Sequence, residues 1–115
     1  MIVVDTNVIA CLALPGPYLE HAQQLLRQEP EWAAPLLWRS EFRNVLALYM
    51  RRQQMTLAQA QRLQEEMEDL LRGQEFEVPS ADVLHLVNES DCSAYDCEFV
   101  TLGSGLIKRD GRCRI

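Results

Sequence analysis

The sequence of 115 residues has no apolar run close to the roughly 20 residues that a membrane-spanning helix needs. A basic leader and a small-residue cleavage site are also missing, because apolar residues 2–4 follow Met1 directly. The balance of 48% hydrophobic and 24% charged residues is ordinary for a globular protein and excludes intrinsic disorder. We therefore predict a single domain over residues 1–115 that has no membrane segment and lies in the cytoplasm.

Motifs built on cysteine, histidine or glycine are scarce. The sequence lacks Walker A, Gly-x-Gly-x-x-Gly and Gly-x-Ser-x-Gly motifs, which leaves phosphate-binding loops and serine-hydrolase elbows unsupported. His21 and His85 lie far apart in sequence and are not expected to bind metal. No Cys-x-x-Cys pair occurs, so we expect small buried hydrophobic side chains rather than a zinc site or a disulfide framework. The four cysteines are Cys11, Cys92, Cys97 and Cys113.

Positive charge is in short supply. Eleven basic residues, all but Lys108 arginine, face seventeen acidic ones, and the net charge is −6. Proteins that bind nucleic acid passively are usually basic because counterion release supplies most of their affinity, so this class is disfavoured. A site that holds metal cations would be an exception. Residues 108–114 form a locally basic tail, which we expect to flank the path of a polyanion.

Short β-branched or apolar segments alternate with helical patterns along the chain. Strands are predicted at residues 2–4, 32–34, 76–78 and 106–107. Helices are predicted at residues 18–28, 36–52, 57–71, 80–90 and 95–102. The third helix has a capping box at Thr56 and Gln59 with Gly73 at its C′ position, and Ser80 and Ser93 are expected to cap the last two. This alternation predicts an α/β fold with a mostly parallel sheet.

Two carboxylates have apolar surroundings that suggest a function. Asp5 ends the first strand, and ligands bind at the carboxyl ends of strands in open α/β sheets, although an N-cap for the turn that follows would also explain it. Glu41 shares its helix face with Leu37, Val45 and Leu48, where an unpaired charge is costly. Arg39 and Arg43 do not lie on that face and cannot neutralise Glu41 there. We therefore favour a functional role for Glu41.

Asp96 is a third candidate carboxylate. Phe99 and Val100 follow it at helical spacing, so it leans toward a packed face, although a cap shared with Ser93 would also explain it. Three converging carboxylates repel one another and need protons or a cation. Oxygen ligands favour Mg²⁺ or Mn²⁺, which can activate water for attack at phosphorus. An aspartyl-phosphate mechanism is disfavoured because Asn7 stands where a second aspartate is needed.

Three short motifs, in this order and spacing, resemble those of PIN-domain ribonucleases, and most closely the VapC-type toxins of bacterial type II toxin–antitoxin pairs. They are Met-Ile-Val-Val-Asp-Thr-Asn-Val-Ile-Ala at residues 1–10, Ser-Glu-Phe-Arg-Asn-Val-Leu at 40–46 and Ser-Ala-Tyr-Asp-Cys-Glu-Phe-Val at 93–100. The resemblance implies a three-layer α/β/α fold, dependence on Mg²⁺ or Mn²⁺ and cleavage of RNA. It also implies a homodimer and a cognate antitoxin that blocks the site.

The resemblance also assigns roles to individual residues. Asp5, Glu41 and Asp96 would be the catalytic, metal-binding carboxylates, and Asn7 and Ser93 would orient them. The region of residues 103–115 departs from the family pattern and is expected to be shortened, because the Thr-Leu-Gly-Ser-Gly segment at residues 101–105 is predicted to interrupt the helix. In the family a strand that leads into Thr-x-Asp follows this helix. Residues 106–110 would correspond to that strand, with Lys108 where a threonine or serine is expected and Asp110 as a fourth metal-binding carboxylate.

Two further interpretations stay open at this point. The atypical C-terminal region allows a catalytically impaired PIN-like module that still dimerises and binds an antitoxin. The apolar stripe of residues 57–71 allows a non-enzymatic interaction domain, although such a stripe is more often part of a core. Substrate phosphate could be contacted by a set of basic residues, for which ordinary solvated charge is the common alternative: Arg39, Arg43, Lys108 and Arg109.

Overall fold

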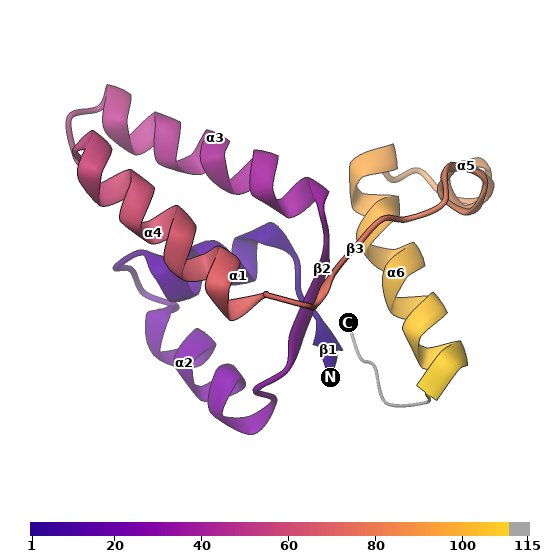
Figure 1. Cartoon of the computed structure of the whole chain (residues 1–115). Helices are drawn as coiled ribbons and strands as arrows, with labels where there is room; N and C mark the ends of the chain where they lie inside the picture. The colour runs from indigo at the N-terminus through magenta and orange to yellow at the C-terminus, as the bar shows by residue number, and fades with distance from the viewer. Residues whose placement is uncertain (111–115) are drawn as a thin grey trace.

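A computed structural model shows helices arranged about a small parallel sheet (Figure 1). It describes residues 1–110, with side chains for residues 1–105. The strands are β1 (Ile2–Val3), β2 (Trp32–Pro35) and β3 (Glu75–Phe76). The helices are α1 (Thr6–Ala13), α2 (Leu19–Gln28), α3 (Leu37–Arg51), α4 (Leu57–Leu70), α5 (Ser80–Glu89) and α6 (Ala94–Asp110). No helix among these residues is long and apolar enough to cross a membrane.

The sheet has the order β1-β2-β3, and both pairs of strands are parallel. Ile2 pairs with Trp32 at one end of the register, and Pro35 pairs with Phe76 at the other. Two helices connect each strand to the next, α1 and α2 in the first crossover and α3 and α4 in the second. The predicted α/β class with a parallel sheet is confirmed.

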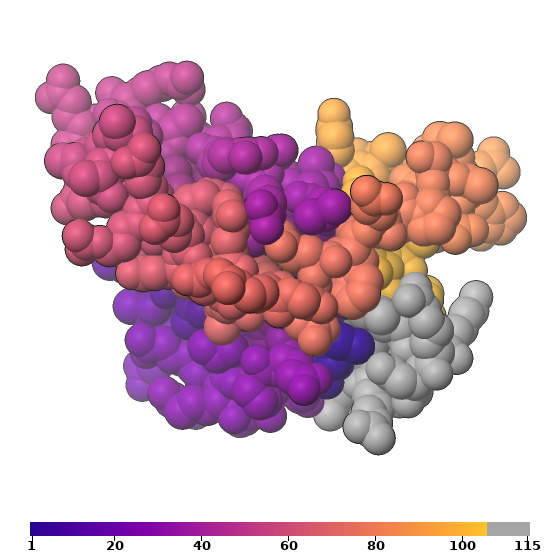
Figure 2. Space-filling model, in the orientation of Figure 1, coloured from indigo at the N-terminus to yellow at the C-terminus, as the bar shows by residue number. Residues whose placement is uncertain are grey.

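Alternation along the strands divides the core between the two faces of the sheet. Ile2 and Trp32 face one way and pack with the fully buried Trp38 and Phe42 of α3. Val3 and Ala33 face the other way, in a second cluster with Leu102 of α6. Helices therefore cover both faces, with α1–α4 on one side and α6 on the other (Figure 1). Helix α5 packs against α6 at the edge of the molecule (Figure 2).

Helix α4 begins at the predicted capping box. The Thr56 hydroxyl accepts from the Gln59 backbone N–H at 3.2 Å, and the Gln59 side chain accepts from the Thr56 N–H at 2.9 Å. Its apolar stripe packs into the core through Ala60, Met67 and Leu71, whereas Leu57 at the start of the helix is exposed. Gly73 adopts a φ of +79°, but it lies one residue beyond the expected C′ position because the C-cap is Leu71.

Three local predictions differ from the structure. Helix α1 was not expected, because only a turn was predicted after Asp5. Strand β3 is Glu75–Phe76 instead of residues 76–78. Ser80 is the first residue of α5 and not its cap, since Pro79 occupies the N-cap position.

The C-terminal region differs most from the prediction. Residues 101–105 do not interrupt the helix, and residues 106–107 belong to α6 instead of a strand. The two glycines of this segment have weak helix propensity, but Phe99 and Leu102, both buried, hold α6 against the sheet. Residues 108–110 are helical, and the side chains of Lys108, Arg109 and Asp110 lie outside the described ones. Residues 111–115, the rest of the basic tail, are outside the described residues altogether.

Glu75 of β3 anchors a charged network at the edge of the sheet. Its carboxylate accepts two hydrogen bonds from the Arg39 guanidinium, at 2.6 and 2.7 Å, and one from the Trp38 indole at 2.7 Å. Arg39 also contacts Glu68 of α4 at 3.1 Å. The pKa of Glu75 is lowered below its ordinary value of 4.5, mainly by the hydrogen bond from Arg39 and against the opposing effect of burial.

Replacing Glu75 with glutamine is expected to lower the free energy of unfolding by about 1.5–3 kcal/mol at neutral pH, because charge-assisted hydrogen bonds are lost. The folded-state pKa of Glu75 lies below the unfolded one, so this stabilisation is complete above about pH 4.5 and is lost as the pH falls through the folded pKa. Urea unfolding at several pH values should show the gap between wild type and variant closing in acid. Glu77→Gln, at an exposed neighbour, serves as the control, and a gap that widened in acid would contradict the assignment.

Candidate functional site

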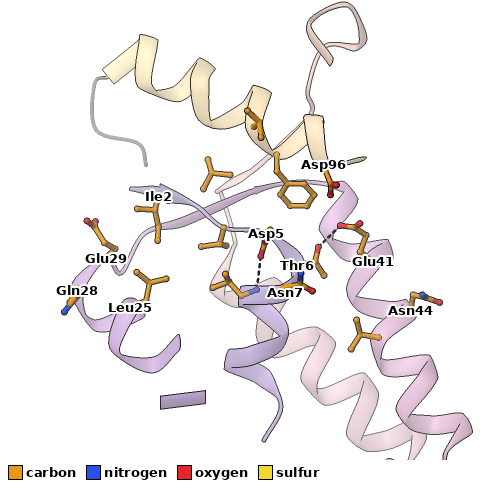
Figure 3. A pocket seen from close by; sticks show the side chains of 16 residues that line it. Ile2, Asp5, Thr6, Asn7, Leu25, Gln28, Glu29, Glu41, Asn44 and Asp96 are labelled. Carbon is orange, nitrogen blue, oxygen red and sulfur yellow. Dashed lines mark hydrogen bonds between the residues drawn. The ribbon is translucent and has the colours of Figure 1, made fainter. Parts of the chain in front are cut away.

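A cavity of about 800 Å³ opens at the carboxyl end of β1 (Figure 3). Its lining includes Asp5 from the junction of β1 and α1, Glu41 from α3 and Asp96 from α6. These three carboxylates are separated by 36 and 55 positions in the sequence, and the fold brings them to the wall of one cavity. The structure therefore gathers the three acidic residues that sequence patterns single out.

Asp5 has both of the roles considered for it. Its Oδ1 atom accepts from the backbone N–H of Val8 at 3.0 Å, which caps α1. Its side chain is nevertheless exposed and lines the cavity, because the strand ends at Val3 and the chain turns into the helix there. Asn7, in the first turn of α1, is also exposed and lines the same cavity. The strand-to-helix turn thus presents two polar side chains at the mouth.

Glu41 is held by a residue that the sequence did not single out. The buried Thr6 hydroxyl donates to the Glu41 Oε1 atom at 2.7 Å, and this bond joins the start of α1 to α3 (Figure 3). In this arrangement one carboxylate oxygen of Glu41 is satisfied by a neutral donor. Thr6 therefore fixes the orientation of Glu41 without cancelling its charge.

Asp96 lies in the first turn of α6, close to Glu41 in the view of Figure 3. Its backbone N–H donates to the Ser93 hydroxyl at 3.1 Å, so Ser93 is the predicted cap of this helix. Ser93 does not line the cavity and acts on Asp96 only through the backbone. Phe99 and Val100, one turn further along, form apolar wall beside the carboxylate. The Asp96 side chain is exposed and free to meet a ligand entering the cavity.

Glu98 adds a further carboxylate near this group. Burial raises the pKa of Glu98 above its ordinary value of 4.5, and the nearby negative charge of Glu41 raises it further. A carboxylate whose pKa is raised by burial and by a neighbouring negative charge favours a bound proton or a cation nearby. The sequence contained Glu98 within the third motif, two residues after Asp96, but spacing alone did not separate it from an ordinary solvated helix charge.

Arg39 and Arg43, the two predicted phosphate contacts whose side chains the structure describes, lie outside the cavity wall. The Arg39 guanidinium is engaged by Glu75 and Glu68, as described above. Arg43 donates to the Ser40 hydroxyl at 3.0 Å, one turn back on α3. Neither residue lines the cavity. Arg39 is therefore engaged in ion pairs that stabilise the fold, whereas Arg43 is exposed on α3.

The opposite wall comes from α2 and carries mixed chemistry. Leu25, Gln28 and Glu29 line it, and Asn44 of α3 lies beyond Glu41 at the rim (Figure 3). The Glu29 carboxylate lies 4.0 Å from the amino group of Met1. Apolar, amide and carboxylate groups thus line this side of the cavity, which gives a ligand both polar and apolar contacts.

The donor set at the carboxylate wall consists of oxygen atoms, which is the chemistry that Mg²⁺ and Mn²⁺ prefer. One carboxylate oxygen of Asp5 and one of Glu41 accept a hydrogen bond within the protein, and the second oxygen of each would be the ligand for a cation. Within the part of the chain that the structure describes, no three His, Cys, Asp or Glu side chains are gathered closely enough to hold a metal ion. The residues therefore match such an ion in the type of donor atom and not in how closely the side chains are gathered.

Comparison of the chain with models of known protein families finds no match, and no curated protein matches it either. The geometry of the cavity and its carboxylates is therefore the basis for assigning a function.

Proposed function

We propose that this protein is a metal-dependent endoribonuclease with a PIN-like three-layer α/β/α fold, and that it is the toxin of a type II toxin–antitoxin pair. The observation that carries the proposal is that Asp5, Glu41 and Asp96 all line one cavity. Each comes from one of the three motifs that resemble PIN-domain ribonucleases. The proposal includes a homodimer and a cognate antitoxin as partners, both taken from that resemblance.

The charges around the cavity support a cation as part of the proposed site. The negative charge of Glu41 contributes to the raised pKa of Glu98, and Asp5 and Asp96 add negative charge at the cavity wall that Glu41 lines. Asp5, Glu41 and Asp96 would hold Mg²⁺ or Mn²⁺. When bound, such an ion activates water and offsets the charge that develops at phosphorus. A cation would also let a protein of net charge −6 accept a polyanion such as RNA.

The chain's own residues have distinct tasks in this proposal. Thr6 keeps the Glu41 carboxylate turned to the cavity through its hydrogen bond, and Ser93 fixes the helix start that carries Asp96. Asn7 offers an uncharged donor at the mouth, where it can bind a phosphate oxygen or a water molecule. Phe99 and Val100 limit water access on one side of the carboxylates. These groups position the reacting phosphodiester and the attacking water.

The direct test is Mn²⁺-dependent cleavage of a mixed RNA pool by the purified wild-type protein, with EDTA added as a reference. Cleavage that stops with EDTA and is missing from identically purified Asp96→Asn protein would support the proposal. Equal cleavage by both proteins would assign the activity to a contaminating nuclease. Absence of cleavage by folded, Mn²⁺-loaded protein over a broad set of RNAs would overturn the nuclease assignment.

A second candidate is a catalytically impaired PIN-like module that dimerises and binds an antitoxin. It is favoured by the course of α6, which runs as helix to Asp110 where the resemblance implies a strand leading to a fourth carboxylate. Such a module would bind the antitoxin tightly and leave RNA intact. Antitoxin binding without cleavage would therefore select this candidate.

Removing the Thr6 hydroxyl is expected to weaken Mn²⁺ binding about tenfold, because residues that orient metal ligands typically contribute 10- to 100-fold in affinity. Thr6→Val keeps the shape and removes the donor, and Thr6→Ser should restore the affinity. The matched control is Thr101→Val, which removes a buried hydroxyl that has no hydrogen-bond partner among the described side chains. Titration calorimetry with Mn²⁺ measures all three, and unchanged affinity in Thr6→Val would show that the bond is only structural.

A further inference from the structure

The cysteines whose side chains the structure describes differ in burial, although the sequence predicts that all are buried. Cys97 is buried, with only 1% of its surface exposed, in agreement with a small hydrophobic role. Cys92, five residues earlier, is exposed, and Cys11 is only half-buried. The prediction of uniformly buried cysteines is therefore wrong for Cys92, which offers a thiol to solvent beside a buried one.

The start of α6 places these two cysteines at positions that ordinarily touch. Ser93 is the N-cap, so Cys92 occupies the N′ position and Cys97 the N4 position. Side chains at N′ and N4 pack together across the first turn in the hydrophobic staple. The pair therefore has the sequence spacing at which a helix start brings two side chains into contact.

The contacts of the Cys97 sulfur point toward the connecting loop. Its Sγ atom lies 3.6 Å from the Ser90 hydroxyl and 4.0 Å from the carbonyl oxygen of Cys92. Because the carbonyl of Cys92 faces this sulfur, a bond between the two sulfurs needs the Cys92 peptide to turn. The hydrogen bonds that the N–H groups of Ser90 and Cys92 donate are weak, since both are 3.4 Å long and the usual range is about 2.7–3.2 Å.

We propose that Cys92 and Cys97 form a reversible disulfide across the first turn of α6, which constrains Asp96 when the surroundings become oxidising. The ring closed by this bond contains Ser93, which caps the helix, and Asp96, which lines the cavity. In reducing compartments, disulfides are as a rule transient and serve redox sensing or catalysis. The site is thus a modification site placed next to the carboxylate wall.

The oxidant in this proposal is a low-molecular-weight disulfide such as oxidised glutathione. The sulfur of Cys92, being exposed, attacks one glutathione sulfur, breaks the S–S bond and releases one reduced glutathione. The Cys97 sulfur then attacks the Cys92 sulfur of the mixed disulfide and releases the second glutathione. The two cysteines lose two electrons and two protons, and the glutathione disulfide gains them as two thiols.

The wild-type protein allows a direct test, because Cys92 and Cys97 are the cysteines of one tryptic peptide, residues 73–108. The protein is incubated with oxidised glutathione, quenched with acid, alkylated and digested. We expect this peptide to lose two hydrogens and both alkylation sites, and to regain both sites after dithiothreitol. In Cys97→Ser, which keeps a polar group beside Ser90, the glutathione adduct on Cys92 should instead persist. A stable adduct on Cys92 in the wild type, or two free thiols, would overturn the proposal.

The consequence for RNA cleavage rests on the proposed nuclease function, whereas formation of the disulfide does not. Turning the Cys92 peptide shifts the ring that carries Asp96, and small displacements of reacting groups cost up to about 100-fold in rate. We expect oxidation to lower Mn²⁺-dependent cleavage at least about tenfold, with recovery in dithiothreitol and no response in Cys92→Ser. Disulfide formation in a protein that never cleaves RNA would refute the nuclease and leave the redox site standing. Equal cleavage by oxidised and reduced protein would refute the link to Asp96.

Discussion

Asp96→Asn is expected to lower Mn²⁺-dependent RNA cleavage by about a thousandfold. Asparagine keeps the size of the side chain and one oxygen, but it removes the negative charge that would hold a cation at the wall of the cavity. Electrostatic stabilisation by a catalytic metal contributes several kcal/mol to the transition state, and each 1.36 kcal/mol corresponds to a factor of ten. The fold should persist, because the Asp96 side chain is exposed and the cap of α6 uses its backbone N–H.

The chain supplies a closely matched control in Asp91→Asn. Asp91 is exposed, lies five residues earlier in the α5–α6 connection and does not line the cavity. Both variants change the net charge by the same amount, so general weakening or strengthening of RNA attraction affects them equally. Initial rates over a range of Mn²⁺ concentrations separate weaker metal binding from slower chemistry. Losses of similar size in both variants would remove Asp96 from the site.

The parallel sheet and most helices could be predicted because their patterns are strongly periodic or continuous. Helix α1 was missed since its residues are apolar nearly all round, and such a segment shows no stripe that distinguishes a helix. The end of α6 was mistaken for a strand because Gly103 and Gly105 each cost about 1 kcal/mol in a helix. Packing of Leu102 against Val3 and Ala33 outweighs that local preference, and no local pattern reveals such a contact.

The candidate site shows the same division between local and distant information. Asp5, Glu41 and Asp96 were found because a carboxylate among apolar neighbours needs a reason for its position. Thr6 was not found, because its partner Glu41 is 35 residues away and a threonine after a strand is unremarkable by itself. Glu98 became notable only when the fold placed Glu41 beside it. Residues that orient or perturb the carboxylates depend on tertiary contacts that the sequence alone does not contain.

Phe42→Ala is expected to lower the free energy of unfolding by about 3–5 kcal/mol, the usual cost of removing a buried phenylalanine. Phe42 is completely buried, and its ring centre lies 6.0 Å from that of Trp38 in the same helix. The cavity left behind borders the residues that pack α3 against the sheet, so the surroundings can close it only in part. Urea unfolding followed by circular dichroism measures the change.

The control for Phe42 is Leu57→Ala, which removes a large apolar side chain from the surface, where 61% of it is exposed. That variant should stay within about 0.5 kcal/mol of the wild type. Because Glu41 directly precedes Phe42 on α3, loosening this helix should also weaken the hold of Thr6 on the Glu41 carboxylate. Phe42→Ala is therefore expected to lower Mn²⁺ affinity even at temperatures where the protein remains folded. A destabilised protein with unchanged Mn²⁺ affinity would show that the core and the carboxylate wall are independent of each other.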